Sequence, residues 1–349
     1  MSLLITSTKK NAGKTMIGVG IGQHHPGKVG FFKPLGTNLD HGVDEDVALF
    51  KEVFQLTEDL EQFNISHDYH RILHDVKDRG KEKGTDNDKD LTQTVCERYS
   101  LLSQGKDFMI IETAHTMSYG SYTGLSAPQI AAVLNVPGLL VAEGKPEKIV
   151  DKSIMAEHCF NVKDARLLGV VINRCETFDD EYTAHLEEKD IPILGVIPEH
   201  DQLKTPTCED VIDTLDGELI AGEEGLRKKV ENTIVGAMTY DSAVSTLQQM
   251  VFPENSVMIT GGDRADMQLL AFDMKSSLIV LTGGTYPSMA VLAKADELQV
   301  PVVSVTYDTM TAAQRCEQTV AQLRPHHAPL IKEIVGKYID VKRILEEAG

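Results

Sequence analysis

Ser7-Thr8-Lys9-Lys10-Asn11-Ala12-Gly13-Lys14-Thr15 follows the apolar run Leu3-Leu4-Ile5 near the start of the chain. This order is typical of a buried strand that leads into a phosphate-binding loop and then a helix. In such a loop, backbone N–H groups surround the phosphates of a nucleotide, and the positive end of the helix dipole points at them. The pattern predicts that Lys14 binds the β- and γ-phosphates and that Thr15 binds Mg²⁺. A chance Gly-Lys-Thr at the start of a helix is the alternative. The stretch predicts a class of ligand, but not a reaction.

Composition and charge narrow the class of protein. The chain has 349 residues, of which 42% are hydrophobic, which is enough for two buried cores. Its 34 Lys and Arg residues against 53 Asp and Glu residues give a net charge of −19. Such a surface repels nucleic acid and anionic lipid, so we expect neither nucleic acid nor a membrane as a partner. Five cysteines without a Cys-x-x-Cys pair favour reduced thiols in a cytoplasmic protein. We find no leader and no apolar run of about 20 residues, which favours the same location.

Short apolar runs alternate with helical patterns over the first 200 residues. The runs lack polar alternation, which predicts strands buried on both faces of a parallel sheet, at 3–5, 29–32, 108–111, 138–141, 167–172 and 193–197. Helices are expected between them, for example over 14–22, 45–53 and 146–159. The alternation predicts an α/β fold with a doubly wound, mainly parallel sheet over residues 1–200.

A second alternating pattern begins after residue 200. Strands are expected at 233–237, 257–260, 278–281 and 302–305, and helices at 242–250, 265–272, 287–298 and 311–323. This pattern predicts a smaller α/β domain over residues 201–325. Residues 326–349 are expected to form a separate C-terminal helix, amphipathic over 330–347.

Polar residues follow three of the predicted strands of the first domain. Lys33, before Pro34, ends the second strand, and Glu112 and Asn173 end later strands. Ligands of a doubly wound sheet bind at the carboxyl ends of its strands. The Asn173 carboxamide could donate and accept hydrogen bonds at the edge of an adenine base, or the residue belongs to a plain turn. Asp44 and Asp46, at the start of a helix, suit either a helix cap or a carboxylate ligand of Mg²⁺. The sequence leaves open which of the two would bind the metal, and we assign Asp46.

The first 200 residues resemble the dethiobiotin synthetase-like P-loop domain at the N-terminus of long bacterial phosphotransacetylases. Thr8 stands where the common Gly-x4-Gly-Lys-[Ser/Thr] pattern has its first glycine, as in dethiobiotin synthetase, and Lys9 matches the signature lysine of deviant P-loop ATPases. Residues 201–320 resemble the DRTGG regulatory domain that follows in those proteins. The motifs that carry this second resemblance are Val235-Gly236-Ala237-Met238, Gly262-Asp263-Arg264 and Leu281-Thr282-Gly283-Gly284.

The resemblance implies ATP and Mg²⁺ as cofactors and assigns roles to residues. The residues expected at the nucleotide are Thr8, Lys9, Asn11, Gly13, Lys14, Thr15 and Asn173, and those at the metal are Thr15, Asp46 and Glu112. Lys9 would reach the nucleotide of a partner subunit in a homodimer, and Lys33 would contact phosphate and substrate. The chain departs from the family after Glu112, where Thr113-Ala114-His115-Thr116 replaces a glycine-rich turn.

Two functions remain open from the sequence. The first is a nucleotide sensor that acts through the DRTGG domain, with a metabolic enzyme as a candidate partner. The second is an ATP-dependent ligase of the dethiobiotin synthetase or cobyrinate amidating type, with Lys14 and Lys33 supporting phosphoryl transfer. The replaced glycine-rich turn favours the sensor. Because no acetyltransferase domain follows the DRTGG pattern, we expect no acetyl transfer by this chain alone.

Overall fold

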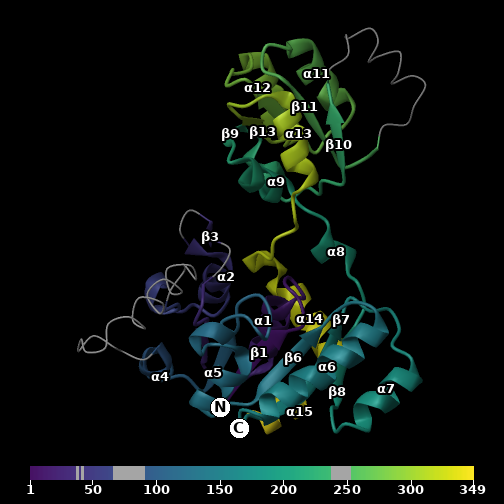
Figure 1. The fold of residues 1–349 in the computed structure, drawn as a ribbon. Coiled ribbons are helices and arrows are strands. Elements are labelled where there is room, and N and C mark those ends of the chain that lie inside the picture. Colours follow the sequence, from purple (N-terminus) through teal and green to yellow (C-terminus); the bar gives the residue numbers. More distant parts are fainter. Residues whose placement is uncertain (37–38, 41–42, 66–90, 237–252) are drawn as a thin grey trace. The chain divides into compact units, whose positions relative to one another are not determined.

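The computed structural model describes residues 1–36, 39–40, 43–65, 91–236 and 253–349 (Figure 1). Contacts divide the chain into two compact units. The first comprises Met1–Glu199 and Leu323–Gly349, and the second comprises His200–Gln322. The second unit is therefore inserted into the sequence of the first, and the C-terminal residues belong to the first unit.

A six-stranded parallel sheet forms the centre of the first unit, in the order β2-β5-β1-β6-β7-β8. Its strands are β1 (Ser2–Ser7), β2 (Val29–Phe32), β5 (Phe108–Glu112), β6 (Gly138–Ala142), β7 (Leu167–Asn173) and β8 (Ile193–Ile197). The apolar runs lie buried in this sheet, so the predicted fold class is confirmed. β3 (Leu39–Asp40) and β4 (Val43–Asp44) form a separate antiparallel pair.

Helices pack on the sheet in two groups. α1 (Lys14–His24) packs against β1 and β5, with α2 (Glu45–Val53) beside it, whereas α5 (Ala127–Leu134) and α6 (Pro146–Asn161) pack against β6. The remaining helices are η1 (Leu60–Gln62), α4 (Leu91–Leu102), η2 (Ser121–Thr123) and α7 (Asp180–Glu187). β1 lies between β5 and β6, at the point where the strand order reverses. Ligands of doubly wound sheets bind at such a point, and here it carries the phosphate loop.

The C-terminal segment completes the first unit. After η4 (Pro325–His327), α14 (Ala328–Tyr338) packs along α1, where a Cβ on Gly20 would lie 2.3 Å from Val335 Cγ2. The single helix predicted over 330–347 is wrong, because the chain breaks before α15 (Val341–Glu347). Ile339 forms a bridge to Gly195, and the Asp340 side chain accepts a hydrogen bond from the Arg343 amide to cap α15.

The second unit contains its own five-stranded sheet, in the order β10-β11-β12-β13-β9. The strands are β9 (Glu218–Ala221), β10 (Asn232–Val235), β11 (Ser256–Gly261), β12 (Leu278–Thr282) and β13 (Val302–Ser304), and the helices are α8 (Asp201–Lys204), α9 (Cys208–Leu215), η3 (Glu223–Gly225), α11 (Ala265–Asp273), α12 (Met289–Leu298) and α13 (Thr309–Glu317). β9 is antiparallel to β13 and was not predicted. α13 ends before the predicted limit of residue 323, and the helix predicted over 242–250 lies outside the described residues.

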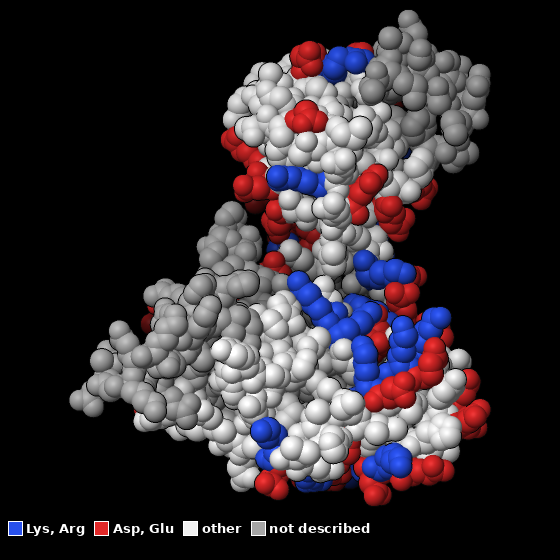
Figure 2. Space-filling model, in the orientation of Figure 1, with Lys and Arg blue, Asp and Glu red and all other residues white. Residues whose placement is uncertain are grey.

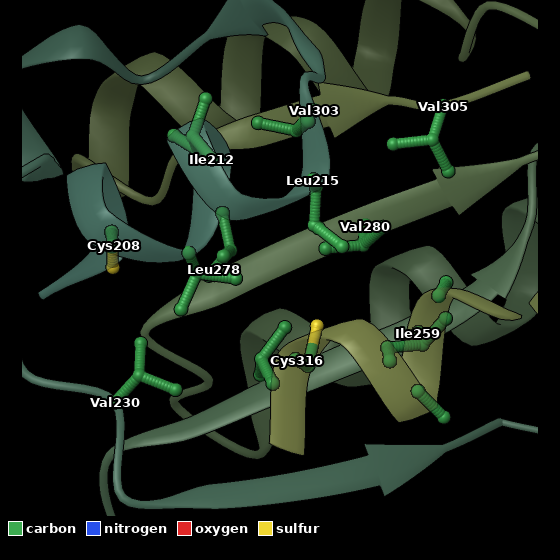
Figure 3. Close-up of a cluster of buried hydrophobic side chains, with 14 residues drawn as sticks. Cys208, Ile212, Leu215, Val230, Ile259, Leu278, Val280, Val303, Val305 and Cys316 are labelled. Carbon is green, nitrogen blue, oxygen red and sulfur yellow. The ribbon is translucent and has the colours of Figure 1, made fainter. Parts of the chain in front are cut away.

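Strand alternation gives this unit two hydrophobic cores. Val257 and Ile259 face one cluster, formed with α9 and α13 (Figure 3). Met258, between them, faces the opposite cluster, which includes residues of α11 and α12. Successive side chains of a strand point to opposite faces, so both faces of this sheet are covered.

Two further observations concern the cysteines and the length of the apolar helices. All five cysteines are free thiols, as the sequence predicts. In the part of the chain that the structure describes, no helix has the length and apolarity needed to cross a membrane.

Candidate functional site

The phosphate loop connects β1 to α1 and requires glycine at its end. Gly13 caps α1 with a φ of 96°, a conformation that favours glycine. A Cβ at this position would lie 2.2 Å from Asn173 Nδ2. The Asn173 side chain in turn donates a hydrogen bond from Nδ2 to the Ala12 carbonyl, at 2.8 Å. Asn173 thus holds the loop in place, and its role in base recognition stays a prediction.

Lys14 lies inside the loop, with 7% of its surface exposed. Its Nζ donates to Ser7 Oγ at 3.3 Å and to the His115 carbonyl at 3.1 Å. Burial lowers the pKa of Lys14, and the neighbouring Lys33 acts in the same direction, while Glu112 and Asp46 oppose them. A buried ammonium group with two neutral partners is suited to an incoming anion.

Three side chains with oxygen atoms meet at this site, those of Thr15, Asp46 and Glu112. Thr15 Oγ1 lies 2.9 Å from Asp46 Oδ1 and 3.1 Å from Glu112 Oε1, yet a hydroxyl has one proton to donate. Glu112 Oε2 is buried and has no hydrogen-bond partner among the described residues. Two carboxylates and a hydroxyl form a donor set that fits Mg²⁺, which also takes oxygens from bound phosphates. Within the described ranges, no cluster of three or more His, Cys, Asp or Glu side chains offers a metal site built from such groups alone.

Lys33 forms a buried ion cluster with two aspartates. Its Nζ lies 2.9 Å from Asp44 Oδ1 and 2.5 Å from Asp46 Oδ2. Burial lowers the pKa of Lys33, but the charges of Asp46 and Asp44 outweigh burial and raise it overall. Burial raises the pKa of Asp46, but Lys33 and Thr15 outweigh this effect and lower it. Asp44 also caps α2 by accepting from the Val47 amide, so Asp46 is the aspartate that reaches Thr15.

The outer side of the phosphate loop is held by charged residues that the sequence reasoning missed. Glu143 Oε1 pairs with Lys9 Nζ at 2.7 Å, and Glu143 Oε2 pairs with Arg174 at 2.9 Å. Arg174 also donates to the Asn11 carbonyl at 3.0 Å. Thr8 lies beside this network, and its Oγ1 is buried without a partner in the described part of the chain. Glu112 ends β5, and Glu143 directly follows β6. Because both stand at the end of a strand, Glu143 could have been recognised as a candidate site residue from the sequence.

The DRTGG motif residues lie in the second unit. Arg264 forms a bidentate ion pair with Asp266, with both N–O distances at 3.0 Å. Gly283 and Gly284 both have positive φ, at 84° and 64°, as a tight turn requires.

The buried Glu112 carboxyl should make the stability of the metal-free protein depend on pH. Burial and the charge of Asp46 raise the pKa of Glu112 to about 8. A carboxyl group with a raised pKa stabilises the fold below its unfolded pKa of about 4.3, and this contribution is lost as pH rises towards the folded value. In EDTA, we expect the free energy of unfolding to fall between about pH 5 and pH 8 in wild type, and much less in Glu112→Gln. Urea denaturation across this range measures the difference, and equal slopes would contradict it.

Comparison with known proteins supports the two-domain organisation. A family described as an AAA domain matches residues 1–207, and the DRTGG domain family matches residues 210–319. The expected P-loop domain followed by a DRTGG domain is thus confirmed. The phosphate acetyltransferase of Synechocystis sp. is 24% identical and aligns with 99% of this chain and 51% of its own length. That of Nitrosomonas europaea is also 24% identical, over 74% of this chain and 40% of its own length. The chain spans about half the length of these relatives or less.

Solved structures resemble each unit more distantly. The MinD cell division protein of Aquifex aeolicus is 16% identical, with a TM-score of 0.37, over 58% of this chain and 83% of its own. The CBS and DRTGG domains of the regulatory region of Clostridium perfringens pyrophosphatase are 20% identical, with a TM-score of 0.28, over 39% of this chain and 67% of theirs. Because the AAA domain match covers more than half of the residues, the chain belongs to the AAA domain family and carries a DRTGG domain after its P-loop domain.

Proposed function

We propose that this chain is a MgATP-binding regulatory protein in which the DRTGG domain responds to the nucleotide state of the P-loop domain. The observation that carries the proposal is the meeting of two lysines, a threonine and two carboxylates where β1, β2 and β5 end. These are Lys14, Lys33, Thr15, Asp46 and Glu112. Lysines and a P-loop bind phosphate, and hydroxyl and carboxylate oxygens bind Mg²⁺.

Each side chain would have a defined task when nucleotide binds. Lys14 would exchange the Ser7 hydroxyl and the His115 carbonyl for phosphate oxygens. Thr15, Asp46 and Glu112 would hold Mg²⁺, which neutralises phosphate charge when bound. Lys33 would keep Asp46 ionised and oriented towards Thr15, because its ammonium group already contacts Asp46 Oδ2 at 2.5 Å.

Regulation, rather than catalysis, is supported by the sequence after Glu112. The Thr113 hydroxyl bonds to Thr6 Oγ1 at 2.8 Å, and the segment up to Thr116 lacks the glycines that let a substrate approach the backbone. The phosphate acetyltransferases that align with this chain suggest control of a metabolic enzyme. We further propose that the protein is a cytoplasmic homodimer to which Lys9 contributes, as the P-loop resemblance implies.

Calorimetric titration with ATP tests the proposal. We expect binding in Mg²⁺ that weakens at least tenfold in EDTA, because the carboxylates at Thr15 then repel the phosphates. Sedimentation of the same samples with and without ATP tests the dimer. Binding that does not depend on Mg²⁺ would contradict the metal assignment, and no binding would contradict the function. Phosphate release stimulated by bicarbonate, diamines or carboxylates would instead indicate the ligase.

A further inference from the structure

We infer that Glu143 weakens and tunes the hold of the phosphate loop on polyphosphate anions, by pairing with two cations that would otherwise attract the ligand. The inference rests on the proposed function, because it concerns the same nucleotide site. Glu143 lies directly after β6, and its side chain is 13% exposed. Both of its carboxylate oxygens are engaged, one by Lys9 and the other by Arg174.

The two cations belong to the loop or contact it directly. Lys9 is a loop residue with a 44% exposed side chain, and Arg174 donates to the carbonyl of Asn11. Lys152, on α6, donates to the Thr8 carbonyl at 3.2 Å. Figure 2 shows Lys and Arg side chains gathered with acidic ones on the first unit, in the region of β7 and α6. The chain as a whole has a net charge of −19. A gathering of Lys and Arg side chains is therefore a local departure from the overall charge.

Glu143 changes the charge that a ligand would meet. With the carboxylate present, Lys9, Arg174 and Glu143 together carry a charge of about +1, and without it they carry about +2. The resulting attraction grows with the charge of the ligand and is screened by salt. Glu143 should therefore lower the affinity for ATP more than for ADP, and for ADP more than for AMP.

A purely structural role for Glu143 predicts a different pattern. If its main effect were to hold Arg174 against the Asn11 carbonyl, loss of the carboxylate would loosen the loop. All three nucleotides would then bind more weakly, and by similar factors. The order of the three affinities distinguishes the two roles.

Glu143→Gln tests the inference, because glutamine keeps the shape and can still accept a hydrogen bond. We expect ATP to bind about tenfold more tightly at low ionic strength, with a smaller gain for ADP and almost none for AMP. The gain should shrink in 0.5 M salt, where the Debye length falls to about 4 Å. Glu147→Gln is the matched control, because Glu147 is exposed in the first turn of α6; its effect should stay within about twofold.

Two further results decide the outcome. Adding Lys9→Gln to Glu143→Gln should remove most of the gain, because it removes one of the two freed cations and returns the local charge to about +1. The inference is overturned if Glu143→Gln binds ATP no more tightly than wild type, or if Glu147→Gln shows an equal gain. In either case, MgATP binding by wild type still upholds the proposed function. Absence of nucleotide binding by wild type would overturn both. Urea denaturation of each variant shows whether it is folded. If Glu143→Gln does not fold, the inference requires that Arg174→Gln weaken the binding of ATP more than the binding of AMP.

Discussion

Lys14→Ala is expected to lower the affinity for MgATP by a factor of a hundred or more, roughly the loss of two charge-assisted hydrogen bonds. Lys14 is the lysine whose Nζ lies over the interior of the phosphate loop, held by Ser7 and the His115 carbonyl. Lys9 cannot replace it, because its ammonium group is paired with Glu143. Calorimetry or displacement of a fluorescent nucleotide measures the loss.

The fold should survive this substitution. The pKa of Lys14 is lowered chiefly by burial, so its charged form gains little from the unliganded protein. Lys189→Ala is the control, because Lys189 is exposed and precedes β8, at the edge of the sheet opposite the phosphate loop. Equal nucleotide affinity in Lys14→Ala and Lys189→Ala would refute the P-loop assignment.

Lys33→Ala should have the largest effect on stability, lowering the free energy of unfolding by about 3–5 kcal/mol. Lys33 is 1% exposed, and the Asp44 side chain that it contacts is fully buried. Alanine would remove the ammonium group that lies 2.9 Å from the buried Asp44 carboxylate and 2.5 Å from that of Asp46. Urea denaturation at neutral pH measures the loss.

Two comparisons make this prediction specific. Lys106 forms a 2.8 Å ion pair with Glu58 whose two side chains are 14% and 22% exposed, and Lys106→Ala should cost less than Lys33→Ala, about 1 kcal/mol. Asn at position 44 can still cap α2, so adding Asp44→Asn to Lys33→Ala should recover part of the stability. A loss in Lys33→Ala no larger than that in Lys106→Ala would show that the buried cluster does not stabilise the fold.

Local sequence patterns were sufficient for the parallel sheet and for much of the site. The strand at 29–32 and the helix at 45–53 were predicted with the limits that β2 and α2 have, because their apolar periodicity and the Asp44 cap are local signals. The convergence of Thr15, Asp46 and Glu112 could be expected because parallel strands end at one edge of a sheet.

Features that depend on tertiary contacts could not be read from the sequence. The pairing of Lys33 with Asp44 depends on how the chain turns between β2 and α2. The pairing of Glu143 with Lys9 and Arg174 depends on β6 lying between β1 and β7 in the sheet, an order that local patterns do not give. The break before Asp340 depends on the contact of Ile339 with Gly195, because the local pattern continues as a helix. The antiparallel β9 is short and mostly half-buried, which gives it little apolar signal.

The insertion of the second unit sets the order in which a ribosome can complete this protein. The phosphate loop is synthesised within the first fifteen residues, but its helix α1 is covered by α14, which ends at Tyr338. In the nascent chain, the side of α1 that carries Gly20 therefore stays uncovered at first. All of His200–Gln322 is synthesised before Val335, which packs against Gly20. Domains generally fold as units during synthesis. The second unit can thus fold on the ribosome before the first unit is complete, which reverses the usual N-terminal-first order.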